Sequence, residues 1–208
     1  MALTRKVKKG QVVLYKGEAP TSIYVVKDGL VRASNILDSG EERTVGLFGP
    51  GEYFPVGVAF GIAPVALFYY ETLLNSELEV YQIEEFEKTL KGASYDDAKK
   101  LASQYIAMML HVAALGHKSA RNKLANMLQF LSLRFGESLT GKTFVRISVP
   151  LTQDDIARMS GLSRETVTVE LGKLKSEGII EVKSKQYLVN TKKLLKIIDE
   201  NEDIQVSL

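Results

Sequence analysis

Hydrophobic positions in residues 1–90 occur in short runs that are rich in β-branched and aromatic residues. The runs alternate with segments in which glycine can supply the positive φ angles of tight turns. These segments are Gly17-Glu18, Lys27-Asp28-Gly29, Asp38-Ser39-Gly40 and Gly49-Pro50-Gly51. Short strands at regular spacing predict a small antiparallel barrel or roll. We expect its strands at residues 12–15, 23–27, 30–37, 43–48 and 78–83.

A helical period replaces this pattern at residues 94–116, where Ser94 and Asp96-Asp97 suit a helix start and Gly116 suits its end. Apolar residues recur there at spacings of three and four. They are Leu101, Tyr105, Met108, Met109, Val112 and Leu115. This apolar stripe is longer than packing against one small roll requires, so we expect part of it to pack against a partner helix from a second subunit. A second helix, capped by Ser119, is predicted at 119–135, and a short strand at 144–150.

The most informative stretch is 151–190. Thr152 and Asp155 form a capping box that opens a helix reaching about Met159. Ser160-Gly161-Leu162 is a tight turn, and Ser163 caps a second helix that reaches about Ser176. Two helices joined by a short glycine turn are typical of the DNA-binding helix-turn-helix.

Two further features accompany this helix pair. Apolar residues on both helices are expected to face inward and hold them together: Ile156, Met159, Leu162, Val167, Leu171 and Leu174. Gly178 then ends the second helix, and strands at 179–182 and 186–189 form a wing. A capped surface helix without function would not need the preceding helix, the turn, the apolar contacts and the wing, so the DNA-binding interpretation is favoured.

A helix-turn-helix presents the first turn of its second helix to a major groove. Arg164 can donate two hydrogen bonds to guanine O6 and N7, and Glu165 can accept one from cytosine N4. Other side chains are suited to phosphates, namely Gln153, Ser163, Thr166, Lys183 and Lys185. Thr152, Thr168 and Val169 complete the candidate DNA-binding set.

The charge distribution agrees with this interpretation. Residues 1–116 hold 12 Lys and Arg against 14 Asp and Glu, whereas residues 117–198 hold 15 against 7. A basic segment beside a mildly acidic one suits a division between nucleic-acid binding and another task. The chain has no cysteine, which excludes disulfides and Cys-ligated metal or iron–sulfur sites, and it has only two histidines. We therefore expect no metal and no cofactor, and we interpret His111 and His117 as structural or surface residues.

At these residues the chain resembles the CRP/FNR superfamily of bacterial transcription factors. Residues 162–167, Leu-Ser-Arg-Glu-Thr-Val, match the family's recognition-helix pattern closely. The roll turns are similar as well, at Gly17-Glu18, Ile23-Tyr24, Gly29, Gly40-Glu41 and Gly49-Pro50-Gly51-Glu52. The resemblance covers nearly the whole chain. It implies an α+β protein with an antiparallel, cyclic-nucleotide-binding-like β-roll (1–93), a long dimerisation helix (94–117) and a winged helix-turn-helix (118–208).

The same resemblance implies a homodimer on a two-fold DNA site, with each recognition helix reading one half-site about one helical turn from the other. Arg164 and Glu165 fall on the family's base-contacting positions. The family often has an arginine four residues after this glutamate, and here that position is Val169. A valine can contact only a thymine methyl group, so we expect a half-site that differs from the most familiar family sequence.

The sensor roll departs from the family in a second way. Members that bind cyclic AMP have a Phe-Gly-Glu-Leu-type segment, whose Glu binds the ribose, and an Arg-Ser or Arg-Thr pair, whose Arg binds the cyclic phosphate. The corresponding positions here are Phe54-Pro55-Val56-Gly57 and, near the pair, Phe68-Tyr69, while Met108-Met109 replace polar residues near the base. A buried phosphate would lack its charged partner, so cyclic AMP binding is not expected.

These positions define a candidate effector pocket of Val56, Phe68, Tyr69, Met108 and Met109. Two alternatives remain open. The pocket takes an apolar or aromatic effector, or these side chains fill it and no ligand is needed. A signal, if there is one, would act through a hinge near Gly116–Ser119 that sets the angle of the recognition helices.

Other classes of function are less consistent with the residues. There is no nucleophile elbow, His-Glu-x-x-His pair, Walker loop or dinucleotide fingerprint, so an enzyme is not expected. A helix-turn-helix that binds only proteins is the remaining alternative, and it predicts DNA affinity that does not depend on Arg164. No apolar run is long enough to span a membrane, and we expect a cytoplasmic protein. Activation would require contact with RNA polymerase, and no residue pattern identifies such a surface.

Overall fold

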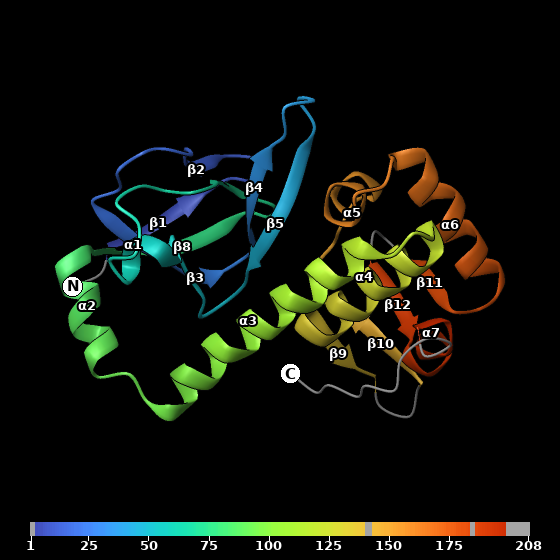
Figure 1. Ribbon diagram of the computed structural model, residues 1–208. Helices are drawn as coiled ribbons and strands as arrows, with labels where there is room; N and C mark the ends of the chain where they lie inside the picture. Colours follow the sequence, from blue (N-terminus) through green and yellow to red (C-terminus); the bar gives the residue numbers. More distant parts are fainter. Residues whose placement is uncertain (1–2, 140–142, 184–185, 199–208) are drawn as a thin grey trace. The chain divides into compact units, whose positions relative to one another are not determined.

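The computed structural model describes residues 3–139, 143–183 and 186–198 of the 208-residue chain. The chain divides into two compact units, Met1–Lys99 and Lys100–Leu208. Strands dominate the first unit, and helices that surround a small sheet dominate the second (Figure 1). The predicted α+β class is therefore confirmed.

Two four-stranded antiparallel sheets form the N-terminal unit. The first has the order β1 (Leu3–Val7), β8 (Ser76–Gln82), β3 (Ser22–Asp28) and β6 (Tyr53–Phe54). The second has the order β2 (Val12–Leu14), β7 (Tyr69–Thr72), β4 (Val31–Ile36) and β5 (Glu42–Phe48). One core cluster contains residues of both sheets, including Val26 and Leu78 from the first and Val31 and Tyr70 from the second. The sheets therefore pack face to face, as expected for a β-roll.

Aromatic rings fill the middle of this core. The Phe54 ring is fully buried and stacks on Tyr70 and Tyr24, with ring centroids 4.9 and 5.4 Å apart. Phe48 packs against Phe54 at 5.6 Å with its ring tilted. Each aromatic pair contributes about 0.5–1.5 kcal/mol beyond its buried area. Ring contacts of Phe54 with Tyr70 and with Phe48 thus link the two sheets, alongside the aliphatic residues of the core.

The sequence did not predict the strands β1, β6 and β7. The first four residues of β1 are exposed, β6 has only two residues, and β7 has only four. Ile83 was expected to end a strand, but it begins the helix α2 (Ile83–Lys91). Glu84 and Glu85 stand in the first turn of that helix, where carboxylates are favoured by the helix dipole. A one-turn helix, α1 (Val56–Ala59), follows β6.

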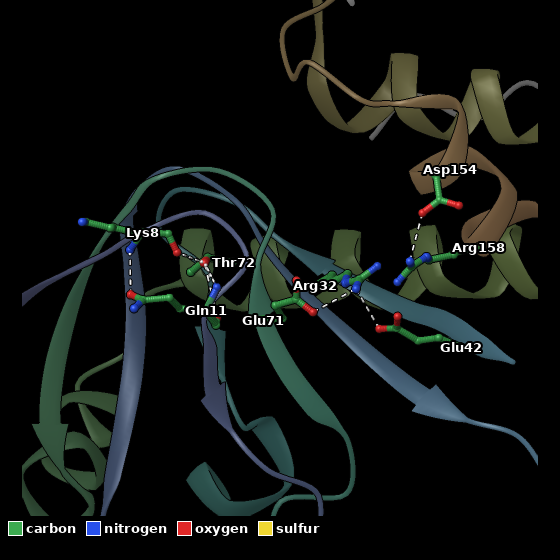
Figure 2. Close-up of polar contacts among 8 residues, drawn as sticks. All are labelled: Lys8, Gln11, Arg32, Glu42, Glu71, Thr72, Asp154 and Arg158. Carbon is green, nitrogen blue, oxygen red and sulfur yellow. Dashed lines mark hydrogen bonds and ion pairs between the residues drawn. The ribbon is translucent and has the colours of Figure 1, made fainter. Parts of the chain in front are cut away.

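A buried arginine lies on β4. The side chain of Arg32 is 5% exposed, and its guanidinium forms ion pairs with Glu42 at 2.8 Å and Glu71 at 2.9 Å (Figure 2). Glu71 is directly opposite Arg32 in the β4–β7 register. A buried charge without such partners would be costly, so the two carboxylates account for its presence there.

A hydroxyl group closes the turn between β1 and β2. Thr72 Oγ1 donates to Lys8 O at 2.6 Å and accepts from Gln11 N at 3.2 Å, as Figure 2 shows. Gly10 N donates to Thr72 O at 2.7 Å. Polar backbone groups that strand pairing leaves without partners are thereby satisfied by the end of β7.

The C-terminal unit contains the sheet β11 (Ile180–Lys183), β12 (Gln186–Asn190), β10 (Phe144–Ile147) and β9 (Gly136–Ser138) in that order. Its helices are α4 (Ala120–Phe135), α5 (Gln153–Ser160), α6 (Arg164–Ser176) and α7 (Thr191–Ile198). Leu124, Leu128 and Leu131 of α4 are fully buried, as their spacing predicts. The sequence prediction missed β9 and α7.

The long helix α3 (Tyr95–Gly116) crosses the division between the two units. Its start is a reciprocal cap, because Asp97 N donates to Ser94 Oγ at 3.3 Å and Ser94 N donates to Asp97 Oδ2 at 2.9 Å. Ser94 and Asp97 thus open the helix as predicted.

Gly29 provides a test of the roll. Its φ is +96°, and a Cβ atom there would lie 2.3 Å from Ser76 Oγ and 2.7 Å from Asn75 O. Gly29→Ala should therefore lower the free energy of unfolding by about 3 kcal/mol or more, through backbone strain and overpacking together. Gly40→Ala is the matched control, since φ is +81° there and nothing lies within 4 Å of the Cβ position. It should cost only about 1 kcal/mol. Urea denaturation measures both, and equal losses would contradict the close approach at Gly29.

Candidate nucleic-acid interface

The first helix of the motif begins at a complete capping box. Thr152 Oγ1 accepts from Asp155 N at 3.1 Å, and Asp155 Oδ2 accepts from Thr152 N at 2.9 Å. Each of these two hydrogen bonds satisfies a backbone N–H group that has no acceptor inside α5. An ion pair of 3.0 Å between Asp154 and Arg158 spans one turn of the same helix (Figure 2). The predicted start of this helix is confirmed.

A left-handed glycine joins the two helices. Gly161 has a φ of +68° and a ψ of 29°, and its N–H donates to Ala157 O at 3.0 Å. Only glycine adopts this conformation without strain, so the chain can reverse here within a few residues. Ser163 then caps α6 by accepting from Thr166 N at 3.2 Å. The turn and the bounds of α6 agree with the prediction.

Apolar side chains hold α5 and α6 together. Ile156 and Met159 on α5 and Val167, Leu171 and Leu174 on α6 are each at most 5% exposed. Leu162 in the turn is half-buried. The end of α6 is also fixed, because Ile179 N donates to Leu174 O and Gly178 N to Lys175 O, which is a Schellman arrangement. The buried face of α6 leaves its opposite face free to contact a ligand.

The open face of α6 presents the predicted base-reading residues. Arg164, Glu165, Thr168 and Val169 are exposed, and Val169 is 56% exposed. Residues four apart on a helix share a face, so Arg164 lies beside Thr168 and Glu165 beside Val169. An arginine, a carboxylate and an apolar side chain thus stand within two turns of one helix end. Groups of these three kinds distinguish guanine, cytosine and thymine in a major groove.

A contact between the two helices adds to this face. Thr168 Oγ1 lies 2.7 Å from Gln153 Oε1 and 2.8 Å from Arg164 O. The hydroxyl shares its single hydrogen between these two acceptors, and the NH₂ group of Gln153 is not used in this contact. Sequence analysis included both Gln153 and Thr168 among the candidate DNA-binding residues, but their spacing did not predict that they contact each other.

The carboxyl group of Glu165 has a pKa lowered from its ordinary value. The causes are a hydrogen bond from its own backbone N–H, a hydrogen bond with the Ser163 side chain and the positive charge of Arg164. Glu165 is therefore ionised at neutral pH and can only accept hydrogen bonds. This state is the one that suits the amino group of cytosine.

The wing forms as predicted. Strands β11 and β12 pair antiparallel, with Lys183 opposite Gln186. The Lys183 side chain is 73% exposed and lies 3.0 Å from Glu181. An exposed pair of this kind is weak, so the ammonium group can exchange that partner for a phosphate. Lys185 lies outside the described residues.

The candidate effector residues fall in both units. Val56 on α1 is half-buried, and Phe68 packs against the core cluster of the roll. Tyr69 on β7 makes an edge contact with Tyr15, with ring centroids 6.4 Å apart. Met108 and Met109 lie on α3 in the part that belongs to the C-terminal unit, and they are 49% and 55% exposed.

The described part of the chain offers neither a metal-binding cluster nor a membrane-spanning helix. Within residues 3–139, 143–183 and 186–198, no three His, Cys, Asp or Glu side chains are grouped so that they can hold a metal ion. Among the same residues, no helix is long and apolar enough to span a membrane.

Comparisons with known proteins cover both units. The model of the Crp-like helix-turn-helix domain matches residues 122–197, and the model of the cyclic nucleotide-binding domain matches residues 4–91. The transcriptional activator protein FnrA of Stutzerimonas stutzeri is 25% identical over 183 residues, which are 88% of this chain and 74% of that protein. The matched relatives are transcription regulators, not enzymes.

Solved structures show the same fold. FixK2 from Bradyrhizobium japonicum superposes with a TM-score of 0.76 at 22% identity, covering 100% of both chains. A transcriptional regulator of the CRP/FNR family from Thermus thermophilus has a TM-score of 0.72 at 26% identity, covering 95% of this chain and 98% of that one. Together with the helix pair, its glycine turn and its wing, these matches show that the chain belongs to the CRP/FNR superfamily of transcription regulators, with a Crp-like helix-turn-helix as its DNA-binding element.

Proposed function

We propose that the protein is a homodimeric regulator that recognises a two-fold DNA site through α6 and does not respond to cyclic AMP. The observation that carries the proposal is the exposed first turn of α6, where Arg164 and Glu165 project from a helix whose other face is buried. In this proposal residues 1–93 form the sensor roll, 94–117 the dimerisation helix and 118–208 the DNA-binding domain.

Base contacts are assigned to three residues. Arg164 donates to a guanine, Glu165 accepts from a cytosine, and Val169 packs against a thymine methyl group. Phosphate contacts that position the helix come from the start of α5, from the first turns of α6 and from the wing. They are assigned to Thr152, Gln153, Ser163, Thr166, Thr168, Lys183 and Lys185.

The homodimer is supported by the two faces of α3. One face is buried in this chain, with Ala107, His111 and Ala114 each at most 4% exposed. The other face is apolar but open, with Tyr105 at 61%, Met108 at 49%, Val112 at 64% and Leu115 at 37% exposed. Its spacing of three, four and three residues is that of a two-stranded coiled-coil seam. A second copy of the same helix is the occupant that fits such a seam.

The absence of a cyclic AMP response is supported by the ion pairs that the arginines of the roll form with carboxylates. Residues 1–99 contain Arg5, Arg32 and Arg43. Arg5 lies on the exposed part of β1, Arg43 pairs with Glu41 at 2.8 Å, and Arg32 is buried between Glu42 and Glu71. Carboxylates thus already offset the charges of Arg32 and Arg43, which weakens what either arginine can offer to a cyclic phosphate.

The first test selects binding sites from random DNA with the wild-type protein, at near-physiological salt and without ligand. The selected DNA and its single-position variants are then titrated with the wild-type protein and with Arg164→Ala. The wild-type protein should recover a palindrome with G·C positions in each half. Arg164→Ala should lose about 1–3 kcal/mol of discrimination at one position of the half-site, because a bidentate guanine contact is removed.

Lys183→Ala is the matched control for this titration. It should weaken specific and random DNA alike and reduce the slope of affinity against salt by about one ion, because it removes a phosphate contact. If Arg164→Ala weakens both kinds of DNA equally, the assignment of Arg164 to a base is wrong.

The dimer seam can be tested with two neighbouring residues of α3. Val112→Glu places a charge in the proposed seam and should weaken dimerisation at least about 100-fold, since each subunit loses an apolar contact and buries a carboxylate. Ala113→Glu, one position away and exposed, should leave the dimer intact. Sedimentation velocity distinguishes the dimer from the 23.0 kDa monomer. A dimer that persists in Val112→Glu would show that the seam is not the interface.

Isothermal titration calorimetry with cyclic AMP tests the sensor assignment, with linear AMP as the control nucleotide. We expect no saturable heat in the micromolar range, because carboxylates already offset the charges of Arg32 and Arg43. Saturable micromolar binding of cyclic AMP alone would overturn this part of the proposal.

A further inference from the structure

His111 is a buried histidine on the covered face of α3, and it is only 4% exposed. Its Nε2 atom lies 2.8 Å from the backbone oxygen of Met159 on α5. Its ring stacks on Phe130 of α4, with centroids 5.4 Å apart and an interplanar angle of 30°. Three helices of the C-terminal unit therefore meet at this one side chain.

The chemistry of the contact settles the direction of the hydrogen bond. A carbonyl oxygen can only accept, so Nε2 carries the hydrogen and donates. Met159 O is one of the last four carbonyls of α5, and such carbonyls have no donor within their own helix. Burial lowers the pKa of His111 below its ordinary value, against a smaller opposing effect of the hydrogen bond to Met159. The imidazole is accordingly neutral at pH 7 and makes this contact without burying a charge.

Met159 lies just before the turn that leads into α6, so its hydrogen bond to His111 bears on how α6 is placed. Met159 is followed by Ser160, the left-handed Gly161 and the cap Ser163, and α6 begins directly afterwards. His111 precedes the end of α3 at Gly116, whereas Met159 follows α4 in the chain. The hydrogen bond thus joins the long helix α3 to the last turn of α5, immediately before the turn of the helix-turn-helix.

The far end of α6 is held by α4. Arg121, in the first turn of α4, forms two hydrogen bonds with Glu177 at 2.8 and 2.6 Å. Glu177 is the residue that ends α6. This bidentate pair is partly exposed and acts on the far end of α6, away from Arg164. The buried contact near the beginning of α6 has no solvent to compete with it.

We infer that His111 is a positioning residue for DNA recognition: its hydrogen bond to Met159 couples α3 to the helix-turn-helix, so that the orientation in which α6 is presented follows that of α3. The inference rests on the proposed function. His111 touches no DNA in it, and its effect passes through the turn at residues 160–163. In a dimer built on α3, this bond would relate each recognition helix to the shared helical seam.

Three variants separate this role from simple packing. Glutamine carries an amide nitrogen at about the place of Nε2, whereas asparagine reaches only the place of Nδ1, and leucine has no donor. His111→Leu and His111→Asn should lower affinity for the selected DNA site about tenfold, equivalent to about 1.4 kcal/mol, with less change on random DNA. His111→Gln should restore specific binding to within about threefold of the wild-type value.

A measurement without DNA accompanies these titrations. Hydrogen exchange of the free protein should become faster at residues 161–166 in His111→Leu and His111→Asn but not in His111→Gln, while exchange in the middle of α4 is unchanged. The inference is wrong if all three variants lose equal affinity, or if His111→Leu binds the selected site as tightly as the wild-type protein.

The outcome also distinguishes this inference from the function on which it rests. A wild-type protein that selects no site would overturn the proposed function, and the positioning role with it. A wild-type protein that selects a palindrome, together with unchanged binding by His111→Leu, would overturn the positioning role alone.

Discussion

Burial of one face of α6 against α5 is the constraint on which the DNA-binding unit depends. Val167, Leu171 and Leu174 of α6 and Ile156 and Met159 of α5 are all buried, because covering these apolar side chains excludes water from between the two short helices. Once that face is buried, the helical period places Arg164, Glu165 and Val169 outward. Gly161 allows the two helices to meet at the angle that this packing needs. The chemistry of the exposed turn therefore follows from what its opposite face buries.

The long helix α3 serves two sets of contacts at once. Small residues and His111 line its covered face, while a seam of Tyr, Met, Val and Leu stays open on the other. Ala107 and Ala114 are buried there, and His111 adds a directional contact that alkyl side chains cannot make. A helix with both faces apolar is stable only if each is covered, and in the proposed dimer a second copy of α3 covers the open face.

The roll matches the model of the cyclic nucleotide-binding domain. Stacked rings of Phe54, Tyr24 and Tyr70 occupy its centre, and the buried Arg32 pairs with two carboxylates. In such a domain a signal can change DNA binding only by interacting more favourably with one orientation of the helix-turn-helix than with another. The connection spanned by His111 and Met159 is the place where such a preference would be transmitted.

Local sequence determined the caps, the turns and the helix bounds, because these depend on residues three or four positions apart. Thr152 with Asp155, Ser163 with Thr166 and the left-handed Gly161 all lie where the sequence predicts them. The short strands β1 and β7 were missed because their own patterns are weak: four of the five residues of β1 are exposed, and β7 has only four residues. Only tertiary structure could decide which face of α3 is covered, that Gln153 meets Thr168, and that His111 reaches Met159, 48 residues away. Such contacts arise from the packing of whole helices, and no spacing within a single helix encodes them.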